Sequence, residues 1–210
     1  MFTSPHAFFD LAQAPLQPAL RAEDLGEKPV LVFDTETAGL STPGICQLSY
    51  VLSENGTLTE YDRVLKLPPT VRMSSAAVNI HKITAEASAV GSDPGPELLL
   101  FWQTVQRVLA AGGTVVGHNV SFDAKAFNFS CNKLGLTNEL DARHFLCTMQ
   151  SSKAHSHLLN ARGHPKMFKL GELYTRLYGE PPKWATLHNS LDDVKVTALC
   201  FAAGRREGWW

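Results

Sequence analysis

Three short segments of this 210-residue chain carry acidic side chains in patterns that suit metal binding. The first is Asp34-Thr35-Glu36, where the alternation of side chains along an extended backbone puts both carboxylates on one side. The others are His118 to Asp123 and His188 to Asp193, in which the acids follow expected helix starts. Each segment alone is also consistent with a solvated turn or an ordinary capped helix. The prediction of a site therefore depends on the three segments meeting.

Together, such acids suit the hydrolysis of phosphodiester bonds. Cleavage needs an activated water on one side of phosphorus and a stabilised leaving oxygen on the other, which two cations about 3.5 to 4 Å apart can supply. Carboxylate oxygens without a cysteine favour Mg²⁺ or Mn²⁺ over zinc. A neutral histidine beside the acids can take the proton from the attacking water.

Strands are expected where they can carry these acids. Val30 to Phe33 is a β-branched-rich apolar run, typical of a central strand, and chemistry is expected at its C-terminal end. Ile45 to Ser53 and Leu58 to Leu67 flank Asn55-Gly56, a pattern that predicts an antiparallel hairpin. Further strands are expected at Thr114 to Gly117 and near Phe145.

Helices are expected where apolar residues recur with helical spacing. They are Glu97 to Gly113, a helix capped by Ser121 that runs toward Gly135, Leu170 to Leu177, and Asn189 to Ala203. The order of three strands, helix, strand, helix, strand and terminal helices predicts an α/β fold with helices covering a mixed sheet.

The motifs DTETAGL, HNVSFD and HNSLDDV resemble, in this order, those of the DEDDh family of DnaQ-like 3′-to-5′ exonucleases. The resemblance spans roughly Val30 to Phe201, and IHKIT and KLGELYTRLYGE fit as weaker features. It implies a ribonuclease H-like α/β fold, with a mixed five-stranded sheet whose first three strands are antiparallel, flanked by helices. It also implies five catalytic residues. The metal ligands are Asp34, Glu36, Asp123 and Asp193 for two Mg²⁺ or Mn²⁺ ions, and the general base is His188.

The same resemblance suggests residues that contact the 3′ end. Thr37 and Leu40 follow the first motif, and Leu40 is similar to the apolar residue that wedges beside the terminal base. Asn119 and Phe122 match the second motif, although both are also consistent with structural roles. Ala38 departs from the family, because many members have a second threonine there, which affects the contact to the 3′ end.

A segment free of acidic residues, Ala142 to Gly171, is a candidate phosphate-binding surface. Its predicted contacts are Lys153, Arg162, Lys166 and Lys169. A solvated loop without a special role is the alternative. Zinc binding by His155, His157 and His164 is less favoured, because that spacing lacks a convincing fourth ligand.

The composition fits one domain and gives no global attraction for nucleic acid. Residues are 44% hydrophobic and the net charge is −1, so nucleic-acid contacts must come from local basic surfaces or bound cations. We expect an extension at residues 1–28, whose Phe2, Phe8, Phe9, Leu11 and Leu16 pack on the core, and an exonuclease domain at residues 29–210. Four dispersed cysteines favour buried thiols in a reducing cytoplasm, with the nucleus left open, and no membrane association is expected. The Trp209-Trp210 tail is expected to pack on the domain or on a partner.

The predicted activity is removal of mononucleotides from free 3′ ends, preferably of single strands or frayed ends, with DNA slightly favoured. Trimming of RNA or tRNA 3′ ends is the alternative substrate, because backbone and stacking contacts are offered by both polymers. A catalytically silent nucleic-acid-binding or polymerase-accessory module is the alternative of another class. A homodimer and a polymerase-type partner are both left open.

Overall fold

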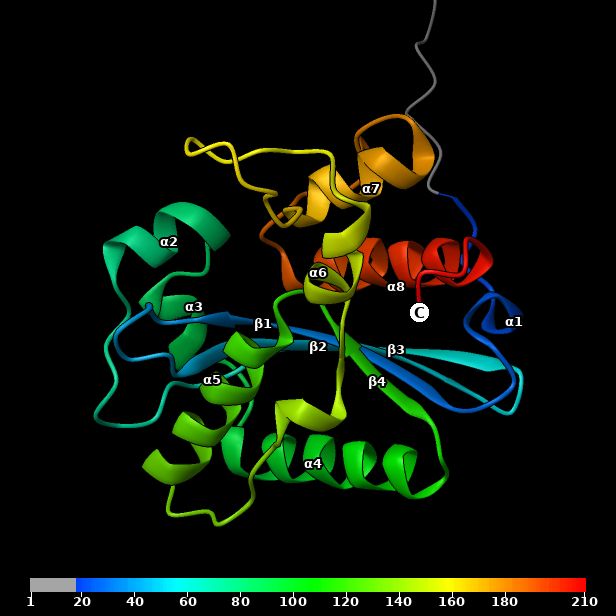
Figure 1. Ribbon diagram of the computed structural model, residues 1–210. Coiled ribbons are helices and arrows are strands. Elements are labelled where there is room, and N and C mark those ends of the chain that lie inside the picture. Colours follow the sequence, from blue (N-terminus) through cyan, green and yellow to red (C-terminus); the bar gives the residue numbers. More distant parts are fainter. Residues whose placement is uncertain (1–17) are drawn as a thin grey trace, which may run out of the picture.

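A five-stranded mixed sheet forms the centre of the computed structural model, which describes residues 18–210 (Figure 1). The strands are β1 Val30–Thr37, β2 Ile45–Glu54, β3 Thr57–Val64, β4 Thr114–Gly117 and β5 Leu146–Cys147, in the order β3-β2-β1-β4-β5. The first three strands are antiparallel, and β1, β4 and β5 are parallel. The predicted α/β class is confirmed, with a mixed five-stranded sheet whose first three strands are antiparallel. The apolar residues expected to pack from the beginning of the chain, through Leu16, lie outside the described residues.

Helices cover both faces of the sheet (Figure 1). They are α1 Ala22–Leu25, α2 Ser75–His81, α3 Ala85–Ala89, α4 Pro94–Ala110, α5 Val120–Lys133, α6 Thr148–Ser151, α7 Leu170–Tyr178 and α8 Ser190–Arg206, with 3₁₀ turns at Ala142–His144 and Ser152–His155. In Figure 1, α4 and α5 lie on one side of the strands and α7 and α8 on the other. No helix within residues 18–210 is long and apolar enough to cross a bilayer.

The first half of strand β1, from Val30 to Phe33, is apolar because each face of the strand meets a helix layer there. Leu31 and Phe33 pack into a cluster that includes Phe101 of α4 and Phe127 of α5. Val30 and Val32 point the other way, into a cluster formed largely by α8. Burial on both faces fixes the position and direction of β1 in the sheet, and therefore the position of the acids at its end.

Positive φ angles mark the turn between β2 and β3 and the turn that leads into α5. Asn55 and Gly56 have φ of 51° and 73°, as a two-residue hairpin turn requires, which confirms the hairpin prediction. The prediction that Ser121 caps this helix is wrong, because α5 begins at Val120 and Asn119 is its N-cap residue. Asn119 has a left-handed backbone with φ of 63°, and asparagine tolerates this conformation better than most residues.

The two ends of the described chain pack against the domain. Leu25 of α1 is fully buried beside Val30 and Ala198. Trp210 stacks on Phe201 at 6.2 Å and donates from Nε1 to its carbonyl. The tail therefore packs on the domain, one of the two expected alternatives. The four cysteines are free thiols, with Cys46, Cys131 and Cys200 buried and Cys147 half-buried.

Candidate active site

Three carboxylates meet where β1 ends beside the start of α8. Oxygens of Asp34, Glu36 and Asp193 all lie within 4.8 Å of one another. Asp34 and Glu36 alternate along β1, and Asp193 lies in the first turn of α8. The hydroxyl of Ser190 donates to the carbonyl of Asp34 at 2.8 Å and so ties the start of α8 to the strand. The first and third sequence motifs are thus brought together.

Asp123, the fourth predicted acid, lies in the first turn of α5 and is not among the three carboxylates within 4.8 Å of one another. Its Oδ1 accepts two hydrogen bonds from Thr35, from the backbone N at 3.0 Å and from Oγ1 at 2.7 Å. The charge of Asp123 contributes to the raised pKa of Asp34. The side chain of Thr35 therefore points toward α5 and holds Asp123 in place. Its neighbours Asp34 and Glu36 belong to the carboxylate cluster.

Burial and mutual repulsion favour the protonated acids when no cation is bound. Burial, followed by the charges of Asp123 and Asp193, raises the pKa of Asp34 well above its ordinary value. Burial is also the main cause that raises the pKa of Glu36 to about 8 and those of Asp123 and Asp193 to about 7. A divalent cation would reverse these shifts, since it stabilises the ionised carboxylates.

One oxygen of the cluster has no protein partner. Asp193 Oδ1 is buried and accepts no hydrogen bond, while Oδ2 accepts from the backbone N–H of His188 at 3.1 Å. A buried carboxylate oxygen without a partner is costly. Together with the oxygen-only composition of the cluster, it fits a hard divalent cation such as Mg²⁺ or Mn²⁺.

His188 is at the edge of this group. It is exposed, it has a left-handed backbone with φ of 69°, and its backbone N–H, not its ring, contacts Asp193. The turn at His188 leads into the Asn189 cap of α8, whose side chain accepts from the N–H of Asp192. The imidazole is thus attached to a turn next to the carboxylates and is open to solvent.

The predicted contacts to the 3′ end differ in their surroundings. Leu40 is 85% exposed just after β1. Asn119 is exposed, Phe122 is half-buried, and Thr37 is buried. Thr37 therefore offers little side-chain surface to a ligand.

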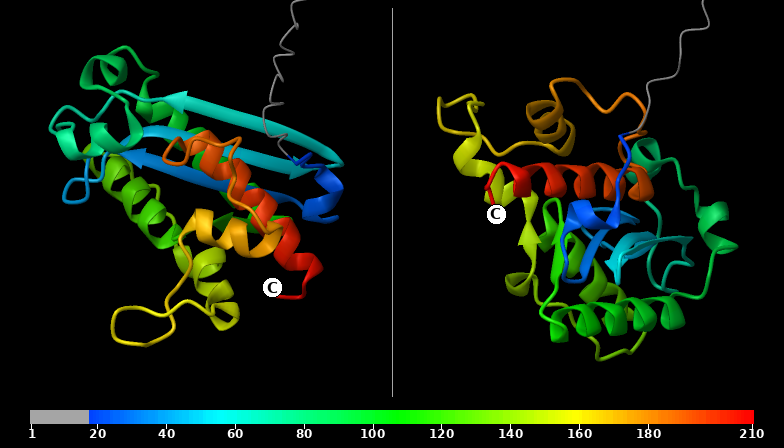
Figure 2. Two further views of the ribbon diagram at one scale, coloured as in Figure 1. Left: turned by 90° about the horizontal axis from the view of Figure 1, so that it is seen from above. Right: turned by 90° about the vertical axis from the view of Figure 1, so that its right-hand side faces the viewer.

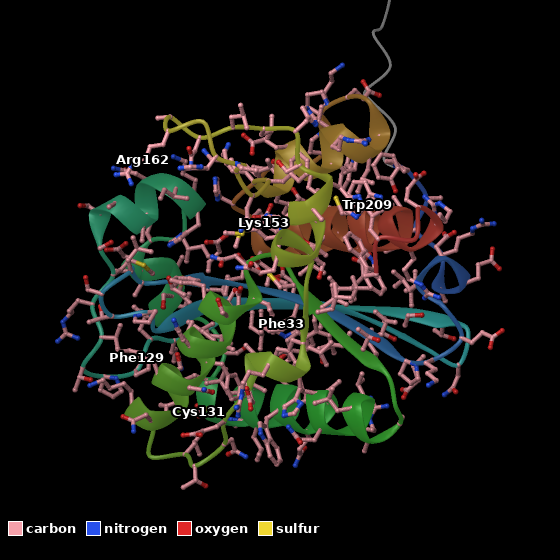
Figure 3. The ribbon with its side chains drawn as sticks, viewed as in Figure 1. Phe33, Phe129, Cys131, Lys153, Arg162 and Trp209 are labelled. Atoms are coloured by element: carbon pink, nitrogen blue, oxygen red, sulfur yellow. The ribbon has the colours of Figure 1, made fainter. Side chains whose placement is uncertain are left out.

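The basic segment forms a protruding hairpin between Leu158 and Lys166. The backbone N of Lys166 donates to Leu158, that of Asn160 donates to His164, and the hairpin stands away from the body in both views of Figure 2. Arg162 is exposed at the hairpin and Lys153 is exposed before it, both on the upper side of Figure 3.

Of the other two predicted phosphate contacts, Lys166 ends the hairpin and is half-buried, and Lys169 is the exposed N-cap residue of α7. Lys166 pairs with Glu172 at 2.7 Å, whereas Lys153, Arg162 and Lys169 make no ion pair within residues 18–210. Zinc binding by His155, His157 and His164 gains no support, because within residues 18–210 the carboxylate cluster is the one group of side chains close enough together to hold a metal ion. His155 instead stacks on Trp209 at 4.2 Å.

The comparison with protein families decides the classification. The family model RNase_T, described as an exonuclease, matches residues 31–201. The chain belongs to this exonuclease family. This membership confirms the resemblance to DEDDh exonucleases drawn from the three motifs. No curated protein sequence matches the chain.

Solved structures share the fold of this exonuclease domain at low sequence identity. The nuclease domain of 3′hExo, a DEDDh family member bound to rAMP, is 16% identical with a TM-score of 0.66, and the match covers 87% of this chain and 94% of that one. E. coli exonuclease I in complex with dA16 is 16% identical with a TM-score of 0.60, and 86% of this chain matches 41% of it. The present chain thus spans about two fifths of the length of exonuclease I.

Proposed function

We propose that the protein hydrolyses the terminal phosphodiester bond at nucleic-acid 3′ ends and releases mononucleotides. The observation that carries this proposal is the carboxylate cluster with its buried, unpartnered Asp193 oxygen. Four side chains would hold two divalent cations, Mg²⁺ or Mn²⁺: Asp34, Glu36, Asp123 and Asp193. When bound, such cations activate the attacking water and neutralise charge on the leaving oxygen.

The protein groups around the cluster have separate tasks in this proposal. His188 accepts the proton from the attacking water, which its exposed position beside Asp193 allows once substrate covers the site. Leu40 stacks beside the terminal base, and Asn119 and Phe122 line the same end. Arg162 and Lys153 contact phosphates further along the strand, since both are exposed and lack an acidic partner in the described chain.

Single-stranded or frayed 3′ ends are the proposed substrate, with DNA slightly favoured. Opening a paired end costs roughly a few kcal/mol per base, so a free strand reaches the carboxylates more readily. The exonuclease I structures in complex with dA16 and dT13 support a DNA substrate by similarity.

RNA 3′-end trimming is the second candidate. It is favoured by the likeness to 3′hExo, whose structures carry rAMP and concern a histone mRNA stem-loop. A silent accessory module is less favoured, because all five catalytic positions of the motifs are filled. A second copy of the chain or a polymerase-type protein remains an expected partner.

One assay tests the activity and its substrate together. Labelled single-stranded DNA, duplex DNA with paired or frayed ends, and RNA of the same sequence are incubated with Mg²⁺ or Mn²⁺, and a circular strand serves as the control without an end. We expect mononucleotides from the linear strands only. Cleavage of the circle, or equal cleavage in excess chelator, would contradict the proposal.

A further inference from the structure

Helix α2 is attached at both ends to the two residues that follow Glu36. The backbone N–H of Ser74, the N-cap of α2, donates to the carbonyl of Ala38 at 2.8 Å. Nε2 of His81, the last residue of α2, lies 3.2 Å from the carbonyl oxygen of Thr37. Figure 1 shows α2 beside this end of β1. The helix therefore brackets the point where the metal-binding strand leaves the sheet.

The imidazole of His81 is held in one tautomer by its backbone contacts. The backbone N–H of Ile83 lies 3.0 Å from Nδ1 and can only donate, so Nδ1 accepts. The hydrogen of the neutral ring is then on Nε2, which donates to Thr37. Burial lowers the pKa of His81, in agreement with a neutral ring. Only 8% of the residue is exposed, so the ring is largely shielded from solvent.

The strand is irregular at the position that His81 contacts. Glu36 is opposite Gln47, but Thr37 is opposite Ile45, so the register shifts between Glu36 and Thr37. At such a shift one residue is left unpaired and the pattern of hydrogen bonds between the strands is interrupted. A contact from outside the sheet can then help to hold the backbone. Cys46, the residue that is skipped, has its Sγ 3.9 Å from Nε2 of His81, and its pKa is raised by burial and by the charge of Glu36. His81 therefore lies beside the irregularity and contacts residues of both strands, Thr37 of β1 and Cys46 of β2.

We propose that His81 is a positioning residue, which fixes Glu36 for metal binding by holding the carbonyl of Thr37. The inference rests on the proposed role of Glu36 as a metal ligand. Within the described residues no hydrogen bond joins the His81 ring to the carboxylate cluster, so His81 acts through the backbone of β1. Residues that support ligands in this way typically change metal affinity or activity by roughly 10- to 100-fold when removed.

Two amide substitutions separate the two contacts of His81. His81→Gln keeps an N–H donor at the position of Nε2, whereas His81→Asn keeps an acceptor near Nδ1 but is too short to reach Thr37. Ser74→Ala is the matched control, because it removes the side-chain cap of Ala77 N and leaves the backbone bond to Ala38. Mn²⁺ binding is measured by calorimetry without nucleic acid, thermal unfolding is measured in chelator, and the half-saturating Mn²⁺ concentration is measured in the nuclease assay.

We expect His81→Asn to raise the Mn²⁺ dissociation constant by roughly 10- to 100-fold and His81→Gln to stay close to wild type. Ser74→Ala should lower the melting temperature without a change in Mn²⁺ binding. Unchanged Mn²⁺ binding in His81→Asn, or an equal loss in Ser74→Ala, would overturn the inference and make α2 a purely structural support. A wild-type protein that neither binds Mn²⁺ nor cleaves would instead overturn the proposed function, and this inference with it.

Discussion

Asp193 carries the most direct prediction at the scale of single residues, because its buried Oδ1 accepts no hydrogen bond from the described residues. Asp193→Asn should lower the cleavage rate by more than the roughly 100-fold typical of losing a ligand's supporting contact. The metal-free protein should keep or gain thermal stability, since repulsion among the acids is relieved. Cleavage rates and unfolding in chelator test both statements, with Asp192→Asn as the neighbouring control that keeps most activity. An active Asp193→Asn protein would remove the basis of the metal site.

His188 has a test that separates its ring from its backbone. Because φ at this residue is 69°, His188→Asn is better matched than an alanine substitution, since asparagine tolerates the left-handed region. His188→Asn should lower the rate by on the order of 10² to 10⁴, the usual contribution of a positioned base, while Mn²⁺ binding stays unchanged. Retention of most of the rate would show that His188 only shapes the start of α8.

The acids were predictable from the sequence, but the residues that orient them were not. The motifs identify Asp34, Glu36, Asp123 and Asp193 by type and spacing. Thr35 and Ser190 show no such pattern, because their partners are 88 and 156 residues away along the chain. Contacts between distant residues depend on the packing of whole elements, which local spacing does not encode.

At the scale of elements, the hairpin between Leu158 and Lys166 and the turn before it are the proposed contacts to the phosphates of the nucleic acid. Lys153→Glu and Arg162→Glu should each flatten the dependence of log affinity on log salt by about 0.7 to 0.9, the value of one phosphate contact. Arg143→Glu is the matched control, because Arg143 lies in the same acid-free segment but already pairs with Asp141. Binding of a labelled strand at several salt concentrations gives the slopes. Equal slopes in all variants would mean that the hairpin is a solvated loop that does not contact phosphates.

Long elements were predicted better than short ones. The 17 residues of α4 and of α8 repeat an apolar face several times, and the Asn55-Gly56 turn has a specific chemistry. Helices α2 and α3 have seven and five residues, too few to show a period, and no helix was predicted there. The start of α5 was misplaced because Ser121 has the composition of a cap, whereas the backbone turn at Asn119 decides where the helix begins.

For the whole molecule, the acid cluster predicts that stability without metal falls as the pH rises. The folded pKa values of about 7 for Asp123 and Asp193 and about 8 for Glu36 lie above the ordinary values of about 4 in an unfolded chain. The protonated forms therefore favour the folded state, and this contribution is lost between about pH 4 and pH 8. Melting temperatures in chelator should decline across that range, and less steeply in Asp193→Asn. A flat profile in the wild type would contradict the raised pKa values.

The Trp209-Trp210 tail folds back over a glycine of α8 and so links positions 204 and 210. A methyl group added at Gly204 would overlap the ring of Trp210, which folds back to stack on Phe201. A homologue that keeps the terminal tryptophan is therefore confined to glycine at the position of Gly204. One that has lost the tryptophan is released from this restriction, so the two positions should covary during evolution, independently of any pressure on the catalytic acids.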